Sequence, residues 1–503
     1  MDKEGETRTV AAVDMGSNSF HMIVARLEET GTLSIIDRLR EPVRLGGGLR
    51  SSGKLSREAC ARALDCLEQF GQRIRNLPQG DVRVVGTNTL RIATNAEEFV
   101  QEAQQLLGHP VEIVSGREEA RLIYLGVAHG RATREGKRLV VDIGGGSTEL
   151  IIGEGKDSML RESMYTGCVS ASKQYFSDGK ITEKRMARAI TSAELKFYPV
   201  ASNFSAGKGK WDEAVGCSGT IKSIRNIAHA EGWCDSGITL ESLYKMRSKL
   251  IKQGDIKKLK LENMKEDRAP VLPGGLAVLI AVFETLGIKQ MRVSGQALKE
   301  GLLYDLVGRI QHKDTREATV QSVLKRWSLD TGHAGNVMRT AMSLFEQVEI
   351  DWKLIGENKL ILKWAAQLHE IGLQISHGAY HKHGAYILTH ADLPGFSRTE
   401  QSLLAALILN HRHKFRVSSF EGLVTRAQRP GLRLCVLLRL AVLLHRGRTD
   451  EQVPNISIQV DGPDITLGFP ENWLEQHSLS NADLEKEYRY LKDAGFSLNV
   501  LPL

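Results

Sequence analysis

Cysteine is sparse in this chain of 503 residues: there are six, and no two of them form a CxxC pair. Zinc sites and disulfide frameworks require cysteines at close, repeated spacings, so the sequence indicates neither. Free thiols persist in reducing compartments. We therefore expect a cytoplasmic protein rather than a secreted, disulfide-bonded one.

Long apolar runs are also missing, and we expect no secretory leader. The first residues, MDKEGETRTVAAVD, are charged and contain no leader-like apolar stretch. The longest apolar stretches, 276–283 and 434–444, fall well short of the roughly 20 residues that cross a bilayer, and Arg439 interrupts the second. We expect both to be core helices and any membrane association to be peripheral at most.

Charge of one sign is only mildly in excess. The formal net charge is +7, with 25% charged and 42% hydrophobic residues, which is ordinary globular composition. A modest positive charge attracts polyanions, but it does not distinguish nucleic acid from polyphosphate. The sequence carries no RNA-binding module signature, so we expect no requirement for nucleic acid.

Strand and helix patterns alternate over the first 310 residues, which predicts an α/β layer architecture. The polar stretch RIQHKDTREATVQSV then leads into a helical pattern, and strand-like ISIQV and ITLGF follow near the C-terminus. A chain of this length exceeds one hydrophobic core. We predict two α/β lobes, an all-helical domain and a small α+β appendage, over residues 1–124, 125–310, 311–450 and 451–503.

The strongest local signal is a strand–turn–strand motif that occurs twice. VAAVDMGSNSFHMIVA (10–25) and RLVVDIGGGSTELIIG (138–153) each join two apolar strands by a turn rich in Gly and Ser. One copy alone reads as an ordinary β-turn, but backbone N–H groups of such turns cradle phosphates, and two copies favour that reading. The predicted phosphate-binding residues are Gly16, Ser17, Asn18, Ser19, Gly144, Gly145, Gly146, Ser147 and Thr148.

Each motif also carries an aspartate at the end of its first strand, Asp14 or Asp142, and Glu149 follows the second turn. Mg²⁺ in proteins binds phosphate oxygens together with one or two carboxylates and several waters. We therefore predict that these three carboxylates organise Mg²⁺ across a cleft.

The two motifs and two further stretches resemble the Ppx/GppA family of exopolyphosphatases and guanosine pentaphosphate phosphohydrolases. The stretches are AAVDMGSNSFHMIVAR (11–26), VVGTNTLRIATNA (84–96), IVSGREEARLIYLGVAH (113–129) and LVVDIGGGSTELIIG (139–153). The resemblance implies two actin-like, ribonuclease H-like lobes of the ASKHA superfamily, followed by an HD-like helical domain. It further implies phosphoanhydride hydrolysis with Mg²⁺, allows a monovalent cation such as K⁺, and implies a homodimer.

By the same resemblance, Glu119 is the general base that activates water, Glu118 is its fallback, and Arg91 contacts phosphate. Without the resemblance, these residues would be interpreted as surface residues with no catalytic role. Acidic residues at the start of a helix usually lie in solvent at the positive end of its dipole, and Arg91 would be a surface arginine. The resemblance reverses that preference.

Two substrates fit the resemblance. We favour processive removal of terminal phosphate from inorganic polyphosphate, because Gly146 stands where the guanosine pentaphosphate branch tends to have alanine, and because HGAYHKHGAY looks exopolyphosphatase-like. The alternative is conversion of pppGpp to ppGpp with the same catalytic residues. A kinase would share the fold, but Glu119, as a base that activates water, argues against it. A non-enzymatic polyanion-binding protein would leave the paired motifs unexplained.

The helical domain is rich in histidine and arginine. His333, the pair His369–Glu370 and the later histidines follow the order of metal-dependent HD phosphohydrolases, which they resemble. However, Glu370 replaces the aspartate of the His-Asp pair, so we expect this region to bind a polyanion. A bound metal ion is the alternative. The predicted polyanion channel consists of His377, His381, His383, Arg412 and Lys414.

Overall fold

The computed structural model describes residues 8–28, 32–130, 136–207, 210–311, 313–448 and 453–502. The chain divides into two compact units, Met1–Thr315 and Arg316–Leu503, and each is considered by itself below. The predicted domain boundaries at residues 124, 310 and 450 stay predictions.

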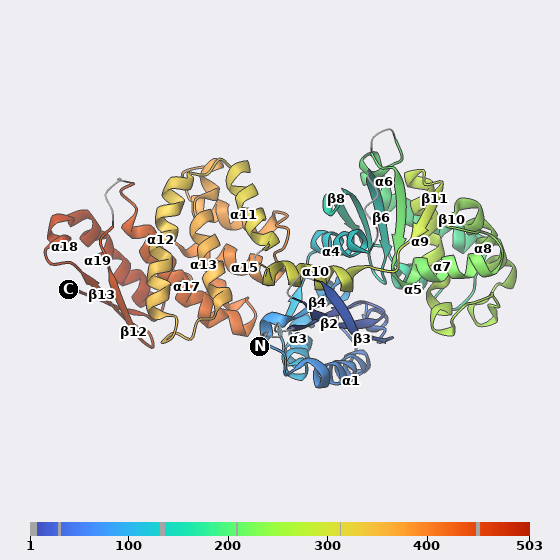
Figure 1. Ribbon diagram of the computed structural model, residues 1–503, viewed down its shortest axis with the longest axis horizontal. Helices are drawn as coiled ribbons and strands as arrows, with labels where there is room; N and C mark the ends of the chain where they lie inside the picture. The colour runs from blue at the N-terminus through green and yellow to red at the C-terminus, as the bar shows by residue number, and fades with distance from the viewer. Residues whose placement is uncertain are drawn as a thin grey trace, which may run out of the picture. The chain divides into compact units, whose positions relative to one another are not determined.

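The first sheet lies in the N-terminal lobe of the first unit and has the strand order β3-β2-β1-β4-β5 (Figure 1). Its strands are β1 (Arg8–Met15), β2 (Phe20–Leu27), β3 (Leu33–Glu41), β4 (Val82–Gly86) and β5 (Val111–Ile113). The centre of β1, from Val10 to Val13, is buried on both faces. Such a strand must be covered by helices on both sides, as in other α/β layers.

On one face the cover includes α10 (Leu298–Ile310), which contacts β1, β2 and β4, and the rest comes from the helices of this lobe. They are α1 (Arg57–Ile74), α2 (Asn88–Ile92), α3 (Ala96–Leu107) and α4 (Gly116–His129). Ser56 caps α1 by accepting a hydrogen bond from the Ala59 amide, and Ser115 caps α4 in the same way from the Glu118 amide. The cap at Ser115 therefore fixes where α4 begins, and so places Glu118 and Glu119 in its first turn.

The second sheet has the order β10-β11-β9-β6-β7-β8. Its strands are β6 (Lys137–Ile143), β7 (Thr148–Glu154), β8 (Asp157–Met164), β9 (Glu213–Cys217), β10 (Ile238–Thr239) and β11 (Gln290–Val293). The helices of this lobe are α5 (Cys168–Tyr175), α6 (Glu183–Phe204), α7 (Ser218–Ala230), α8 (Leu240–Gln253), α9 (Leu272–Leu286) and α10 (Leu298–Ile310).

The two sheets repeat one connectivity. In each, the first strand pairs antiparallel with the second and parallel with a later strand: β1 with β2 and β4, β6 with β7 and β9. The third strand adds antiparallel to the second in both cases. The duplicated motif thus extends to a duplicated lobe, and the predicted α/β fold with two actin-like lobes is confirmed.

The second unit is helical, with a small sheet at its C-terminal end. Its helices are α11 (Thr315–Arg326, which begins at the last residue of the first unit), α12 (Thr331–Val348), α13 (Gly356–Leu368), α14 (Tyr380–His390), α15 (Arg398–Asn410), α16 (Ser418–Glu421), α17 (Thr425–Leu444), α18 (Trp473–Gln476) and α19 (Ser478–Asp493). The two strand-like segments predicted near the C-terminus form an antiparallel hairpin, β12 (Ser457–Asp461) with β13 (Asp464–Phe469). β14 (Ser497–Pro502) adds a parallel strand that the sequence analysis did not anticipate. Ile458 and Ile465 share one core with the helices, so the appendage packs on the helical domain.

One helical segment of the described residues, Glu266–Leu286, is long and apolar enough to cross a membrane, with a mean hydropathy of 1.8. In the structure 72% of its apolar window is buried inside the protein. A core helix passes the same test of length and composition, so this is weak evidence for a membrane span. The predicted core stretch 276–283 lies in this buried segment.

Candidate active site

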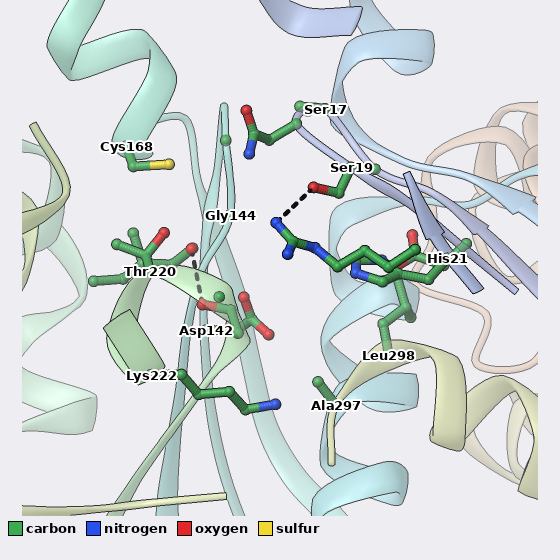
Figure 2. A pocket seen from close by; sticks show the side chains of 18 of the residues that line it. Ser17, Ser19, His21, Asp142, Gly144, Cys168, Thr220, Lys222, Ala297 and Leu298 are labelled. Carbon is green, nitrogen blue, oxygen red and sulfur yellow. Dashed lines mark hydrogen bonds and ion pairs between the residues drawn. The ribbon is translucent and has the colours of Figure 1, made fainter. Parts of the chain in front are cut away.

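A cavity of about 510 Å³ lies between the two lobes of the first unit. Figure 2 shows Ser19 and His21 of the first lobe facing Asp142, Thr220 and Lys222 of the second. Of the predicted site residues, the following line it: Asp14, Gly16, Ser17, Asn18, Ser19, Glu119, Asp142, Gly144, Gly145 and Ser147. Folding therefore brings both copies of the motif, 120 to 130 residues apart in sequence, to one cavity.

The two glycine-bearing turns approach each other closely. A Cβ atom added at Gly145 would lie 2.8 Å from the Cβ atom of Ser17, and one added at Gly146 would lie 2.4 Å from Oδ1 of Asn88. Glycine is required at both positions because Ser17 of the opposite turn and Asn88 of α2 occupy the space of a side chain. Gly146 and Thr148 are not among the lining residues; Thr148 is fully buried and donates to the Thr166 carbonyl.

Three predicted metal ligands carry buried or half-buried carboxylates. Asp142 and Glu149 are cross-strand partners in the β6–β7 pair and are 7% and 1% exposed. The Cys217 thiol lies 3.2 Å from Oδ2 of Asp142, and the Ser163 hydroxyl donates to Oε1 of Glu149 at 2.8 Å. Oδ1 of Asp14 is buried and has no hydrogen-bond partner among the described residues.

The electrostatics of this carboxylate group fit a cation. Burial raises the pKa of Asp142 to about 6, and the charges of Glu119 and Asp14 add to the rise. Burial also raises the pKa of Glu149 well above its ordinary value, again with help from Glu119 and Asp142. Carboxylates that repel one another in a buried site suit a divalent cation, and Asp14, Asp142 and Glu149 are the residues that would hold Mg²⁺. A bound Mg²⁺ would neutralise phosphoryl oxygens there.

Glu119 is held by Arg91 at the edge of the cavity. Nη1 of Arg91 donates to Oε2 of Glu119 at 2.6 Å and to the Val114 carbonyl at 3.0 Å. Burial raises the pKa of Glu119, and the Asp14 charge adds to this, although Arg91 opposes it. The arrangement fixes the orientation of a carboxylate that is a stronger base than an exposed one. Arg91 itself is not among the lining residues.

Glu118 is placed quite differently from its neighbour. Its carboxylate accepts two hydrogen bonds of 2.8 Å from Arg121, which in turn pairs with Asp305. Asp305 also binds Arg83, so four buried charges join α4, α10 and β4. Glu118 is not a lining residue of the cavity, and its observed contacts are those of a structural ion pair.

Several cationic lining residues were missed or left unassigned by the sequence reasoning. They are Arg38, Arg40, Lys222, Lys265, Arg268 and Lys299. Burial and the neighbouring Arg40 lower the pKa of Arg268, and burial and Lys299 lower that of Lys222. Cations that crowd one another in this way favour a bound polyanion. Arg40 and Arg268 lie 228 positions apart, so no local pattern could have joined them.

The predicted polyanion-channel residues lie in the second unit. His381 is buried, His383 is half-buried, and His377 and Lys414 are exposed. The Arg412 guanidinium stacks over the Tyr380 ring at 4.5 Å, and the His381 ring lies 5.4 Å from that of His413. The structure thus gathers some of these side chains on α14 and the segment after α15, and the channel itself stays a prediction.

The raised pKa of Asp142 leads to a stability prediction. A rise from 3.8 to about 6 corresponds to roughly 3 kcal/mol, and this stability is present below pH 4 and lost as pH rises through 6. Without Mg²⁺, Asp142→Asn is expected to raise the free energy of unfolding by about 2–3 kcal/mol at pH 7.5 and to change little at pH 4. Urea unfolding at both pH values measures this.

Asp157→Asn is the matched control, because Asp157 is exposed on β8 of the same sheet, two strands away from β6. It should leave stability unchanged at either pH. If Asp142→Asn and the unmodified protein had the same free energy of unfolding at pH 7.5, the charge of Asp142 would not destabilise the fold.

The chain matches two parts of one family. Residues 23–310 match the Ppx/GppA phosphatase family, and residues 315–488 match Ppx/GppA phosphatase, domain III. The chain is 40% identical, over 98% of both chains, to a guanosine-5'-triphosphate,3'-diphosphate pyrophosphatase of Aeromonas hydrophila, and equally to that of Aeromonas salmonicida.

Solved structures agree with the fold. A crystal structure of an exopolyphosphatase from Cytophaga hutchinsonii has a TM-score of 0.53 at 23% identity and covers 60% of this chain and 98% of its own. An exopolyphosphatase-like protein has a TM-score of 0.53 at 26% identity, covering 61% and 99%. Together with the matches above, these findings show that the chain belongs to the Ppx/GppA phosphatase family and is a phosphohydrolase that cleaves phosphoanhydride bonds.

Proposed function

We propose that this protein removes the 5′ terminal phosphate of pppGpp to give ppGpp. The observation that carries the proposal is the 40% identity, over 98% of both chains, to two guanosine-5'-triphosphate,3'-diphosphate pyrophosphatases. This reverses the order of preference from the sequence analysis, in which exopolyphosphatase came first. Gly146 was weighed there against pppGpp, and a single turn residue carries less weight than similarity along the whole chain.

The chemistry assigned to the site is attack of water on the terminal phosphorus. A bond forms between the water oxygen and that phosphorus, the bridging bond to the next phosphate breaks, and Glu119 takes the proton of the water. Arg91 orients Glu119 through the hydrogen bond of 2.6 Å. The backbone N–H groups of the two facing turns are positioned to hold the phosphate oxygens. Mg²⁺ as the resident cation is part of this proposal.

The cavity suits a substrate with several phosphates. Besides the turns and carboxylates, the second lobe lines it with Lys222, Lys265 and Arg268 and with the polar Asn226 and Asn263. pppGpp carries a triphosphate and a diphosphate on one nucleoside, so these cations favour it. Charge alone also attracts a long polyphosphate chain.

Exopolyphosphatase activity is therefore the second candidate. It is favoured by the likeness to an exopolyphosphatase-like protein, at 26% identity over 61% of this chain. The channel predicted in the second unit, processivity, a K⁺ requirement, the homodimer and the cytoplasmic location all stay predictions.

The experiment compares phosphate release from pppGpp and from long-chain polyphosphate by the full chain with Mg²⁺. We expect the higher kcat/KM for pppGpp. Arg268→Gln is expected to lower kcat/KM for pppGpp by about tenfold to hundredfold, since hydrogen bonds to charged groups contribute about 1.5–3 kcal/mol. Lys260→Gln makes the same change of charge at an exposed position outside the cavity and should have no effect.

A higher kcat/KM for polyphosphate would overturn the pppGpp proposal and favour the second candidate. Equal loss of activity in Arg268→Gln and Lys260→Gln would show that overall charge, not the cavity, attracts the substrate.

A further inference from the structure

Three potential metal ligands lie together in the second unit, and none of them belongs to the carboxylate group described above in the first unit. His333 lies on α12, and His369 and Glu370 follow the last residue of α13, which packs beside α12 (Figure 1). One ligand atom from each lies within 4.8 Å of the other two. Nε2 of His333 and Nε2 of His369 are 3.9 Å and 4.0 Å from Oε1 of Glu370.

His369 is oriented as a metal ligand would be. Its Nδ1 lies 2.7 Å from the Ala366 carbonyl, an acceptor, so Nδ1 carries the proton and Nε2 keeps its lone pair. This Nε2 atom is buried on a side chain only 1% exposed, and it has no hydrogen-bond partner among the described residues. A buried acceptor without a donor costs free energy unless something else binds it.

We propose that His333, His369 and Glu370 bind one divalent transition-metal ion of the zinc class. Two imidazoles and one carboxylate form the ligand set of many zinc sites, which leave a fourth position open, whereas Mg²⁺ prefers oxygen ligands only. Ligands at 2.0–2.1 Å in a tetrahedron lie about 3.3 Å apart, so the observed separations need to close by less than about 1.5 Å.

Arg448 is the competitor of the metal in this site. Its Nη2 atom donates to Oε1 of Glu370, the same oxygen that both histidines approach. The Arg448 side chain is 47% exposed, so it can leave for solvent at small cost when a metal ion takes its place. Metal binding and the Arg448–Glu370 ion pair therefore exclude each other.

The test titrates Co²⁺ into the full, metal-stripped chain with Mg²⁺ in excess, so that the oxygen-rich site in the first unit is occupied. The visible absorption of Co²⁺ reports nitrogen ligands and requires no activity. We expect one such Co²⁺ per chain, bound at least about a hundredfold more weakly in His369→Asn and in His333→Asn, because losing even an outer partner of a ligand costs 10–100-fold.

Arg448→Gln is expected to tighten Co²⁺ binding about tenfold, since it removes a charge-assisted competitor. His390→Asn is the control: His390 is exposed at the end of α14, beside Tyr386, and its loss should change nothing. If His369→Asn does not fold because this position is buried, His333→Asn still tests the proposed site.

Two results would overturn the proposal. One is a Co²⁺ spectrum that His333→Asn leaves unchanged. The other is an absence of nitrogen-ligated Co²⁺ in both the unmodified chain and Arg448→Gln, which would make Arg448 the permanent partner of Glu370.

Discussion

Replacing Glu119 with glutamine is expected to lower kcat by about 10²–10⁴-fold, the range that general-base catalysis contributes. Glutamine keeps the shape of the side chain and an oxygen that can accept from Arg91, but it cannot take a proton from water. Glu119 lines the cavity, and its raised pKa brings its basicity closer to neutral pH. Phosphate release with pppGpp and with polyphosphate measures kcat, and KM should change far less.

The pH profile adds a check on this role. The acid form of Glu119 cannot act as a base, so activity of the unmodified protein should fall as pH drops through its raised pKa. The residual activity of Glu119→Gln should lack that dependence on Glu119. Glu97→Gln, at an exposed position in the first turn of α3, is the matched control and should behave as the unmodified protein. Unchanged kcat in Glu119→Gln would remove this residue from the mechanism.

Asp305→Asn is expected to lower the free energy of unfolding by about 3–5 kcal/mol, the usual cost of breaking a buried ion pair by removing one partner. Asp305 is 4% exposed and pairs with Arg83, Arg121 and Arg309. Burial acts to raise the pKa of Asp305, but the three arginines hold it well below the ordinary value. Its carboxylate is thus ionised at neutral pH, and its stabilising effect is lost only as pH falls. Urea unfolding at pH 7 measures the change.

The same change should also reduce activity, because Asp305 on α10 binds Arg121 on α4 and thereby holds the helix that carries Glu119. Asp178→Asn is the control: Asp178 pairs with Arg185 in solvent, at 54% exposure, and its loss should affect stability far less. If both substitutions had equal small effects, the buried charges around Asp305 would contribute no more than a surface pair.

The paired hairpins show what local sequence determines. An apolar strand, an aspartate, a Gly-rich turn and a second apolar strand lead to an antiparallel pair whose turn holds Asp14 or Asp142 at one end. Strand alternation and turn chemistry act over a few residues, so they are visible in the sequence. That the two turns meet within a side chain's width, at Ser17 and Gly145, is visible only in the structure.

Glu118 and Glu119 show the limit of such reasoning. They are neighbours of the same type at the start of one helix, and the sequence alone could only rank them. Successive residues of an α-helix point about 100° apart, so α4 directs Glu119 to the cavity and Glu118 to Arg121. Which face meets the cavity depends on how α4 packs against α10, β7 and β8, and that is a property of the assembled first unit.

The sequence by itself determined the fold class, the duplicated Gly-rich turns and the candidate carboxylates, because each depends on short-range patterns of apolar, glycine and acidic residues. Only the tertiary structure decided that Arg40 and Arg268 would face one cavity and that His333 would meet His369 and Glu370. These groups come from segments tens to hundreds of residues apart. Their proximity follows from the packing of whole helices and sheets, for which no local pattern exists.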